Sequence, residues 1–262
     1  MNSLGKHLLP FLAGALLGAA LGIAAVAQAN ADIQPDAEQL MALANRARSE
    51  AGAPPLRWDP ALAEAALKHT DRMVAEGPIA HRYPGELELS ERAGLTGAHF
   101  DLVEENIAIG PTPAAIHDAW MHSEGHRDNM LNPEVDRVGI AVVASRGVLY
   151  ATADFSRGVQ KLSDIQVEAK VAALIASSGV KLLLDANARV ACRADRGLPS
   201  SARGGAEPSF IMRWQDSDLS HLPNKLSGEL ASGRYHAAAV GSCPPKGDAG
   251  TFTAYRVAVL LY

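Results

Sequence analysis

Three segments in the first half of the chain carry apolar residues at helical spacing. They cover residues 36–51, 59–76 and 112–124, and each places its apolar positions along one face. A residue suited to cap a helix opens each segment, and a glycine ends or kinks each one. The capping residues are Asp36 (in a capping-box pattern with Gln39), Asp59 and Thr112, and the glycines are Gly52, Gly77 and Gly125. The pattern therefore predicts three amphipathic helices.

Between and after these helices the pattern changes to β-rich runs. Residues 104–110 open with two glutamates and an asparagine and continue as a short apolar segment. Residues 137–144 and 147–155 are rich in β-branched and apolar side chains, and the Ser145-Arg146-Gly147 sequence between them suits a tight hairpin. Helices followed by an antiparallel hairpin predict an α+β fold rather than alternating βαβ units.

The last hundred residues repeat a similar order of elements. Residues 156–162 are predicted to be a linker, and Ser163 with Gln166 forms a capping box at the start of a helix. A second helix follows Asp185, and three β-rich runs cover residues 210–214, 234–241 and 252–262. Two interpretations remain open, a degenerate second copy of the first domain and a small unrelated α+β module. Both predict a structural or partner-binding role for this region.

The N-terminal segment predicts export. Residues 8–27 are apolar and small, and Ala27-Gln28-Ala29 matches an A-x-A cleavage pattern. Residues 1–29 are therefore interpreted as a signal peptide. A retained membrane anchor is the alternative, because the apolar stretch just reaches spanning length. Both interpretations place the rest of the chain outside the cytosol, secreted or periplasmic, with membrane contact only through an uncleaved segment. The exported chain then divides into residues 33–158 and residues 163–262.

Cysteine usage agrees with an oxidising compartment. The chain has two cysteines, Cys192 and Cys243, both in its last third. An isolated pair in an exported protein predicts one disulfide, with two buried thiols as the alternative. Closing a loop of this length would stabilise the fold by about 4 kcal/mol in the chain-entropy model.

Composition and charge argue against one class of function, nucleic-acid binding. Hydrophobic residues make up 48% of the 262 residues, which is enough to form a core. The formal net charge is −5, and the chain has no run of like charges. A nucleic-acid-binding surface needs a basic patch, so we expect no nucleic-acid partner.

The stretch of residues 120–132 has the highest density of reactive side chains. It contains His122 and His126, together with Ser123 and Glu124. The H-E-x-x-H pattern of zinc proteases requires a glutamate directly after the first histidine, where this chain has a serine. A Ser123–His126 nucleophile pair would also lack the G-x-S-x-G elbow. We therefore expect Ser123 to orient His126 through a hydrogen bond.

Several ordered motifs resemble those of a known family. The motifs are Trp120-x-x-Ser123-x-Gly125-His126-Arg127-x-Asn129-Met130-Leu131, Val138-Gly139-Ile140, Glu105-Asn106-Ile107 and Leu56-Arg57-Trp58-Asp59-Pro60-Ala61-Leu62-Ala63. They are similar to the signature of bacterial CAP proteins, the cysteine-rich secretory, antigen 5 and pathogenesis-related superfamily, also called SCP-like. His81 stands where that family has its first histidine. The resemblance covers residues 38–155 and identifies residues 33–158 as a CAP-like domain.

The resemblance implies a three-layer α-β-α sandwich with a large open cleft. In many members two histidines and two glutamates meet in that cleft and can hold a divalent cation, often zinc. Carried over to this chain, His81, Glu105 and His126 are three of the four, and the remaining glutamate position falls on Ser123. Two imidazoles and a carboxylate would leave one position open on zinc or another divalent cation. A hydrogen-bonded polar cluster without metal is the alternative.

Two functions from different classes remain. The resemblance favours a binding module whose cleft, formed by His81, Glu105, Ser123 and His126, holds a small-molecule, lipid, peptide or envelope ligand. The alternative is a metal-assisted, peptidase-like hydrolase acting on peptide or cell-envelope substrates. Ser123 and Glu105 are the candidates for a catalytic role in that case. The absence of a nucleophile motif and of the fourth ligand favours binding.

Overall fold

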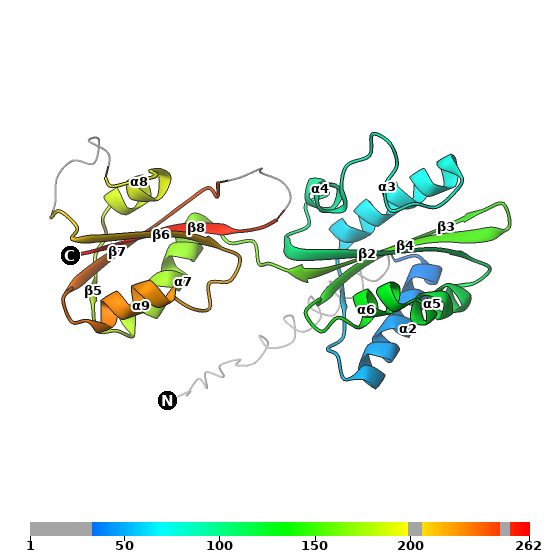
Figure 1. Ribbon diagram of the computed structural model, residues 1–262, viewed down its shortest axis with the longest axis horizontal. Helices are drawn as coiled ribbons and strands as arrows, with labels where there is room; N and C mark the ends of the chain where they lie inside the picture. Colours follow the sequence, from blue (N-terminus) through cyan, green and yellow to red (C-terminus); the bar gives the residue numbers. More distant parts are fainter. Residues whose placement is uncertain (1–32, 199–205, 247–251) are drawn as a thin grey trace, which may run out of the picture.

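The computed structural model describes residues 33–198, 206–246 and 252–262, and these form two successive domains (Figure 1). Each domain has a four-stranded sheet with helices on both faces. The mixture of helices and strands confirms the predicted α+β class and the three-layer sandwich. The predicted export segment, residues 1–29, lies outside the described residues. Within the described part of the chain, no helix has the length and apolarity needed to cross a membrane.

The first domain ends with the strand that closes the predicted hairpin. Its helices are α2 (Pro35–Ala51), α3 (Pro60–Glu76), α4 (Leu89–Leu95), α5 (Pro113–His122) and α6 (Glu124–Leu131). Its strands are β1 (Arg57–Trp58), β2 (Phe100–Gly110), β3 (Arg137–Ser145) and β4 (Val148–Gly158). The sheet order is β1-β3-β4-β2, with β1 parallel to β3 and the other neighbours antiparallel. This order makes β2 an edge strand.

Helix ends in the first domain follow the predicted signals at Asp59, Thr112 and Gly52. The side chains of Asp59 and Thr112 accept hydrogen bonds from backbone N–H groups in the first turns of α3 and α5. Gly52 ends α2 in the left-handed conformation. The start of α2 differs, because the helix begins at Pro35, and the capping box predicted at Asp36 is wrong. Proline suits a first helical position, where its missing N–H costs no hydrogen bond.

The two faces of the first sheet are packed differently. Helices α2, α5 and α6 cover one face, and α3 and α4 cover the other (Figure 1). The first face has an apolar core that includes Leu40, Ile116, Trp120, Met130, Val138 and Phe155. On the second face, α3 approaches β3 so closely at Gly139 that an added Cβ would lie 2.0 Å from the backbone nitrogen of Ala63. A side chain at this position would therefore push α3 away from the sheet.

The second domain contains three helices and four strands in its described part. Its helices are α7 (Asp164–Ala176), α8 (Asn187–Arg193) and α9 (Asn224–Ala231). Its strands are β5 (Lys181–Leu182), β6 (Phe210–Asp216), β7 (Ala237–Cys243) and β8 (Tyr255–Leu261). The sequence pattern missed α9. The predicted linker is shorter than expected, because β4 continues to Gly158 through its pairing with β2.

The second sheet has the same strand order and directions as the first. It runs β5-β7-β8-β6, with β5 parallel to β7 and the other neighbours antiparallel. In each domain an aspartate, Asp59 or Asp185, hydrogen-bonds the first turn of a helix. The residues three and four positions later meet a strand glycine, which is Gly139 in the first domain and Gly241 in the second. This shared geometry favours the interpretation of a degenerate second copy.

The second domain differs from the first in the side chains on the sheet face that α8 covers. The predicted disulfide is present and joins Cys192 of α8 to Cys243 of β7. Both cysteines are buried among apolar residues that include Ala188, Ala258 and Leu260. In the first domain the corresponding face, beneath α3, carries a cluster of charged side chains, so the two domains differ in the chemistry of this face.

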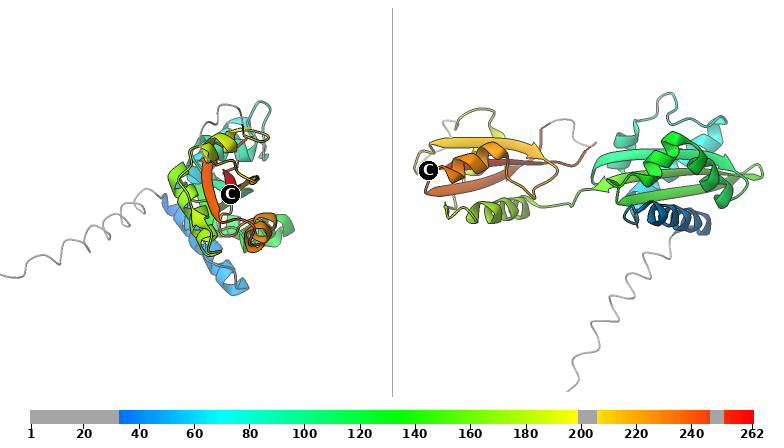
Figure 2. Two further views of the ribbon diagram at one scale, coloured as in Figure 1. Left: turned by 90° about the vertical axis from the view of Figure 1, so that its left-hand side faces the viewer. Right: turned by 60° about the horizontal axis from the view of Figure 1, so that its bottom comes forward.

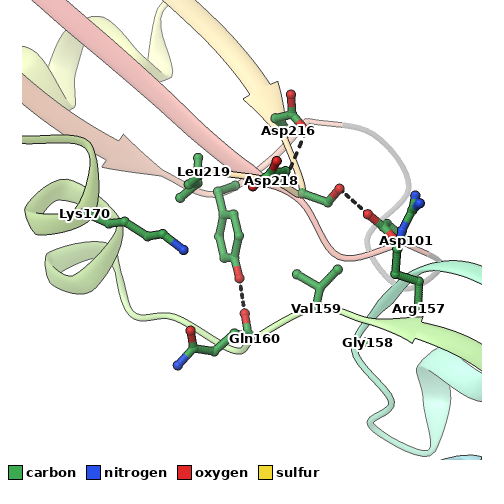
Figure 3. Close-up of a pocket in the computed structure, with 11 residues that line it drawn as sticks. Asp101, Arg157, Gly158, Val159, Gln160, Lys170, Asp216, Asp218 and Leu219 are labelled. Carbon is green, nitrogen blue, oxygen red and sulfur yellow. Dashed lines mark hydrogen bonds and ion pairs between the residues drawn. The ribbon is translucent and has the colours of Figure 1, made fainter. Parts of the chain in front are cut away.

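The domains meet at the start of β2, and Figure 1 and the right-hand view of Figure 2 show them side by side. The backbone N–H of Thr253 donates to the carbonyl of Phe100 at 2.7 Å, and the ring of Phe252 packs edge-on against the ring of Phe100. The Ser217 hydroxyl donates to the carboxylate of Asp101. A crevice of about 450 Å³ lies beside these contacts, with polar and charged side chains around it (Figure 3).

Candidate functional site

Glu105 lies in the middle of β2 and points toward α3 and α4. β2 pairs with β4, and Glu105 lies opposite Asp154 in that pairing. Only 4% of the Glu105 side chain is exposed, so it is not a solvated surface glutamate. Successive strand residues face opposite sides of a sheet, and Asn106 accordingly points toward α6.

His81 lies in the loop between α3 and α4, next to Glu105. Its Nδ1 atom is 2.9 Å from Glu105 Oε1, and 59% of its side chain is exposed. The hydrogen bond from Glu105 raises the pKa of His81 above its ordinary value, against the smaller opposing effect of partial burial. The carboxylate stabilises the imidazolium form of His81, and this ring lies partly exposed at the surface.

His126 lies in the first turn of α6, and its ring centroid is 6.3 Å from that of His81. The two imidazoles come from elements on opposite faces of the sheet and meet at the edge strand β2. Burial, followed by the nearby His81, lowers the pKa of His126. The pair therefore combines one imidazole that holds a proton more firmly with one that tends to stay neutral.

Two asparagines hold the backbone around these imidazoles. The Asn106 amide donates to the carbonyl of His126 at 2.8 Å. The Asn129 amide donates to Asn106 Oδ1 at 3.0 Å and to the carbonyl of Glu105 at 3.2 Å. The adjacent pair Glu105-Asn106 thus serves both faces of β2, because the glutamate contacts His81 and the asparagine positions His126.

Ser123 separates α5 from α6. Its backbone is extended, so the helix breaks there, and Gly125, the predicted break, lies inside α6. Within the described residues the Ser123 hydroxyl has no hydrogen-bond partner, and the predicted bond to His126 is not formed. The carbonyl of His126 is instead held by Asn106. Ser123 is half-buried, and Glu124 is exposed.

Arg92 is a partner of Glu105 that the sequence analysis did not predict. It lies in α4, and only 7% of its side chain is exposed. Its Nη2 atom donates to Glu105 Oε2, and its Nη1 atom donates to the carbonyl of His81 at 3.1 Å and lies 3.4 Å from Glu86 Oε1. No periodic pattern in the short α4 segment distinguishes this arginine from a surface arginine.

Two further titratable residues extend this cluster into the interior. His69 is fully buried in α3, with Nδ1 2.7 Å from Glu86 Oε1 and Nε2 3.9 Å from Glu105 Oε2. Asp154 is also fully buried. Burial, and then the Glu105 carboxylate, raises the pKa of Asp154 well above its ordinary value, which favours the protonated form of Asp154. The helical spacing of α3 could identify His69 only as a core position.

The arrangement brings His81 next to both Glu105 and His126, yet it is not a preformed metal cage. Within the described residues, no group of three or more His, Cys, Asp or Glu side chains is placed to hold a metal ion. Both oxygens of Glu105 already have partners, His81 and Arg92. The groups most accessible to a ligand are the two imidazoles.

Comparisons with known proteins find matches to the first domain. Residues 41–155 match the family model described as the cysteine-rich secretory protein family, CAP. The Bacillus subtilis proteins YkwD and YlbC, the latter a membrane protein, are 31% identical over 112 residues and 33% identical over 107 residues. These alignments cover 42% and 40% of this chain and 44% and 31% of the two relatives, so the chain spans less than half the length of each. A solved extracellular protein with an SCP domain from Bacillus anthracis is 30% identical, covering 48% of this chain and 44% of that chain, with a TM-score of 0.43.

Proposed function

Residues 41–155 are a CAP domain, and from this premise we propose that the protein is an exported binding module whose ligand site is the cleft of His81, Glu105 and His126. One observation carries the proposal. A buried carboxylate holds a half-exposed imidazole at 2.9 Å, and a second imidazole lies 6.3 Å from the first between ring centroids. Imidazoles held in this way at a sheet edge suit recognition of a polar or anionic group on a small-molecule, lipid, peptide or envelope ligand.

A divalent cation, zinc before others, is part of this proposal. Zinc binds imidazole nitrogen and carboxylate oxygen. The side chains of His81, His126 and Glu105 therefore offer suitable ligand atoms. When bound, the cation would supply a Lewis-acidic contact to an oxygen of the ligand. It would have to share Glu105 with Arg92, which already bonds one carboxylate oxygen.

Binding is favoured over hydrolysis because the cleft lacks a paired nucleophile. Among the described residues the Ser123 hydroxyl has no hydrogen-bond partner, whereas an activated serine needs an adjacent base. Glu105, the other candidate, is held between His81 and Arg92. A carboxylate fixed in this way is better placed to orient His81 than to attack a substrate.

Export is proposed from the sequence of residues 1–29 and is supported by the disulfide. Cys192 and Cys243 are joined in the second domain, and such bonds persist in oxidising compartments outside the cytosol. We place the protein in the periplasm or among secreted proteins.

Zinc titration of the purified protein by calorimetry tests the proposal. We expect micromolar or tighter binding that is lost in both His81→Ala and His126→Ala. His122→Ala is the matched control, because His122 is exposed and bonds the carbonyl of Asp118 outside the cleft. Zinc affinity equal to that of the parent protein in all three variants would refute a metal-binding role for the two cleft histidines.

A further inference from the structure

We propose that Arg92 is a built-in cation that occupies the carboxylate end of the cleft and weakens divalent-metal binding there. This inference rests on the proposed function, because it concerns which ligands the same cleft accepts. In this role, Arg92 changes the ligand preference of the cleft from metal ions to neutral or anionic groups.

The contacts of Arg92 place a positive charge where a metal would need a free carboxylate. The guanidinium bonds Glu105 Oε2 and lies 3.4 Å from Glu86 Oε1. The same group donates to the carbonyl of His81 at 3.1 Å, so it also fixes the loop that carries this imidazole. With 7% of its side chain exposed, Arg92 is shielded from water, and its charge is poorly screened.

Arginine is suited to this role because its side chain stays positively charged. A histidine can lose its proton when a metal approaches, whereas a guanidinium stays protonated in proteins. Glu86 and Glu105 bring two negative charges, and Arg92 neutralises one of them. A divalent ion bound at Glu105 would therefore meet a permanent like charge on the same carboxylate.

Variants that separate the charge of Arg92 from its hydrogen bonds test this role. Arg92→Gln removes the charge and keeps a donor toward Glu105, and Arg92→Lys keeps the charge. Arg82→Gln is the matched control, because Arg82 is next to His81 in sequence but is exposed and paired with Glu88. By calorimetry we expect Arg92→Gln to bind zinc about tenfold tighter or more, as a nearby like charge is removed. Arg92→Lys and Arg82→Gln should stay close to the parent.

Further outcomes distinguish a failure of this inference from a failure of the proposed function. The gain in Arg92→Gln should vanish when His126→Ala is added, which locates it in the cleft. Tighter zinc binding by Arg92→Gln alone supports the role of Arg92 even where the parent binds no zinc. Unchanged or weaker binding by folded Arg92→Gln, checked by circular dichroism, overturns it and leaves the proposed cleft intact if the parent binds.

A second variant covers the case in which Arg92→Gln does not fold. Glu86→Gln removes one counterion of Arg92 and leaves Glu105 as its main partner, which should strengthen the hold of the guanidinium on Glu105. We expect zinc affinity to fall in this variant. Equal or tighter binding would contradict the inference.

Discussion

At the scale of single residues, the Glu105 carboxylate sets the charge of His81. The hydrogen bond between them raises the pKa of His81, while burial and His81 together lower the pKa of His126. Because the folded-state pKa of His81 is raised, its interaction with Glu105 stabilises the fold below the unfolded-state pKa. That stabilisation is lost as the pH rises through the folded-state pKa.

Glu105→Gln should therefore change the two imidazoles in opposite directions. The pKa of His81 should fall, since its carboxylate partner is gone. The pKa of His126 should rise, since its neighbour then carries less positive charge near neutral pH. An NMR titration of the histidine ring protons in the parent and the variant measures both shifts. Unchanged values for His81 would show that the Glu105 contact does not form in solution.

Arg48 shows how much one buried side chain supports the loop after α6. It is fully buried in α2. It donates hydrogen bonds to the carbonyls of Pro54, Met130, Asn132 and Val135. Arg48→Met leaves these carbonyls without that donor, and we expect the free energy of unfolding to fall by about 3 kcal/mol or more. Urea denaturation measures the change.

Arg46→Met is the control for this prediction, because Arg46 is exposed and pairs with Glu50 at 3.0 Å. A surface ion pair contributes about 0–1 kcal/mol. Similar losses in the two variants would mean that the burial of Arg48 does not matter to stability.

At the scale of elements, close helix–sheet contact depends on one strand glycine in each domain. A Cβ at Gly139 would lie 2.0 Å from the backbone of Ala63, and one at Gly241 would lie 2.2 Å from the backbone of Ala188. Because helix backbone cannot move aside as a flexible side chain can, we expect each alanine variant to lose about 2 kcal/mol or more. Chemical denaturation of Gly139→Ala and Gly241→Ala checks this.

Gly125→Ala serves as the comparison. Gly125 lies in α6 with nothing within 4 Å of an added Cβ, so alanine should be neutral or stabilise by up to about 1 kcal/mol. Tolerance of alanine at Gly139 or Gly241 would contradict the close packing of α3 or α8.

At the scale of the whole molecule, the cores of the two domains are separate. The apolar residues of α2, α5 and α6 form one core, and those of α7 and α9 form another. The disulfide lies entirely within the second domain. We therefore expect its removal to act on the second domain and to leave the cleft of the first unchanged.

The double variant Cys192→Ala, Cys243→Ala tests this independence. The second domain should lose about 4 kcal/mol, the size estimated for a loop of this length. Unfolding followed through the fluorescence of Trp214, with Trp58 and Trp120 replaced by phenylalanine, reports on that domain. Histidine NMR signals from the cleft should not shift. A shift of those signals would show that the domains are coupled.

The sequence by itself determined several local features of this protein. Asp59, Thr112 and Gly52 lie where helices start and end, and the turn at Ser145–Gly147 joins β3 to β4. Such features depend on neighbouring residues alone, so their patterns are visible in one chain. The resemblance to a family grouped His81, Glu105 and His126 into one predicted site, which no local sequence pattern could have done.

Only the tertiary structure decided which residues surround those three. Arg92, His69 and Asp154 come from α4, α3 and β4, and each would be an ordinary charged or core residue in its own segment. Their role arises from burial against Glu105, and burial depends on how separate elements pack. The break at Ser123 has the same origin, because α6 must turn there to bring the carbonyl of His126 to Asn106. The charge around Glu105 is therefore a property of the fold.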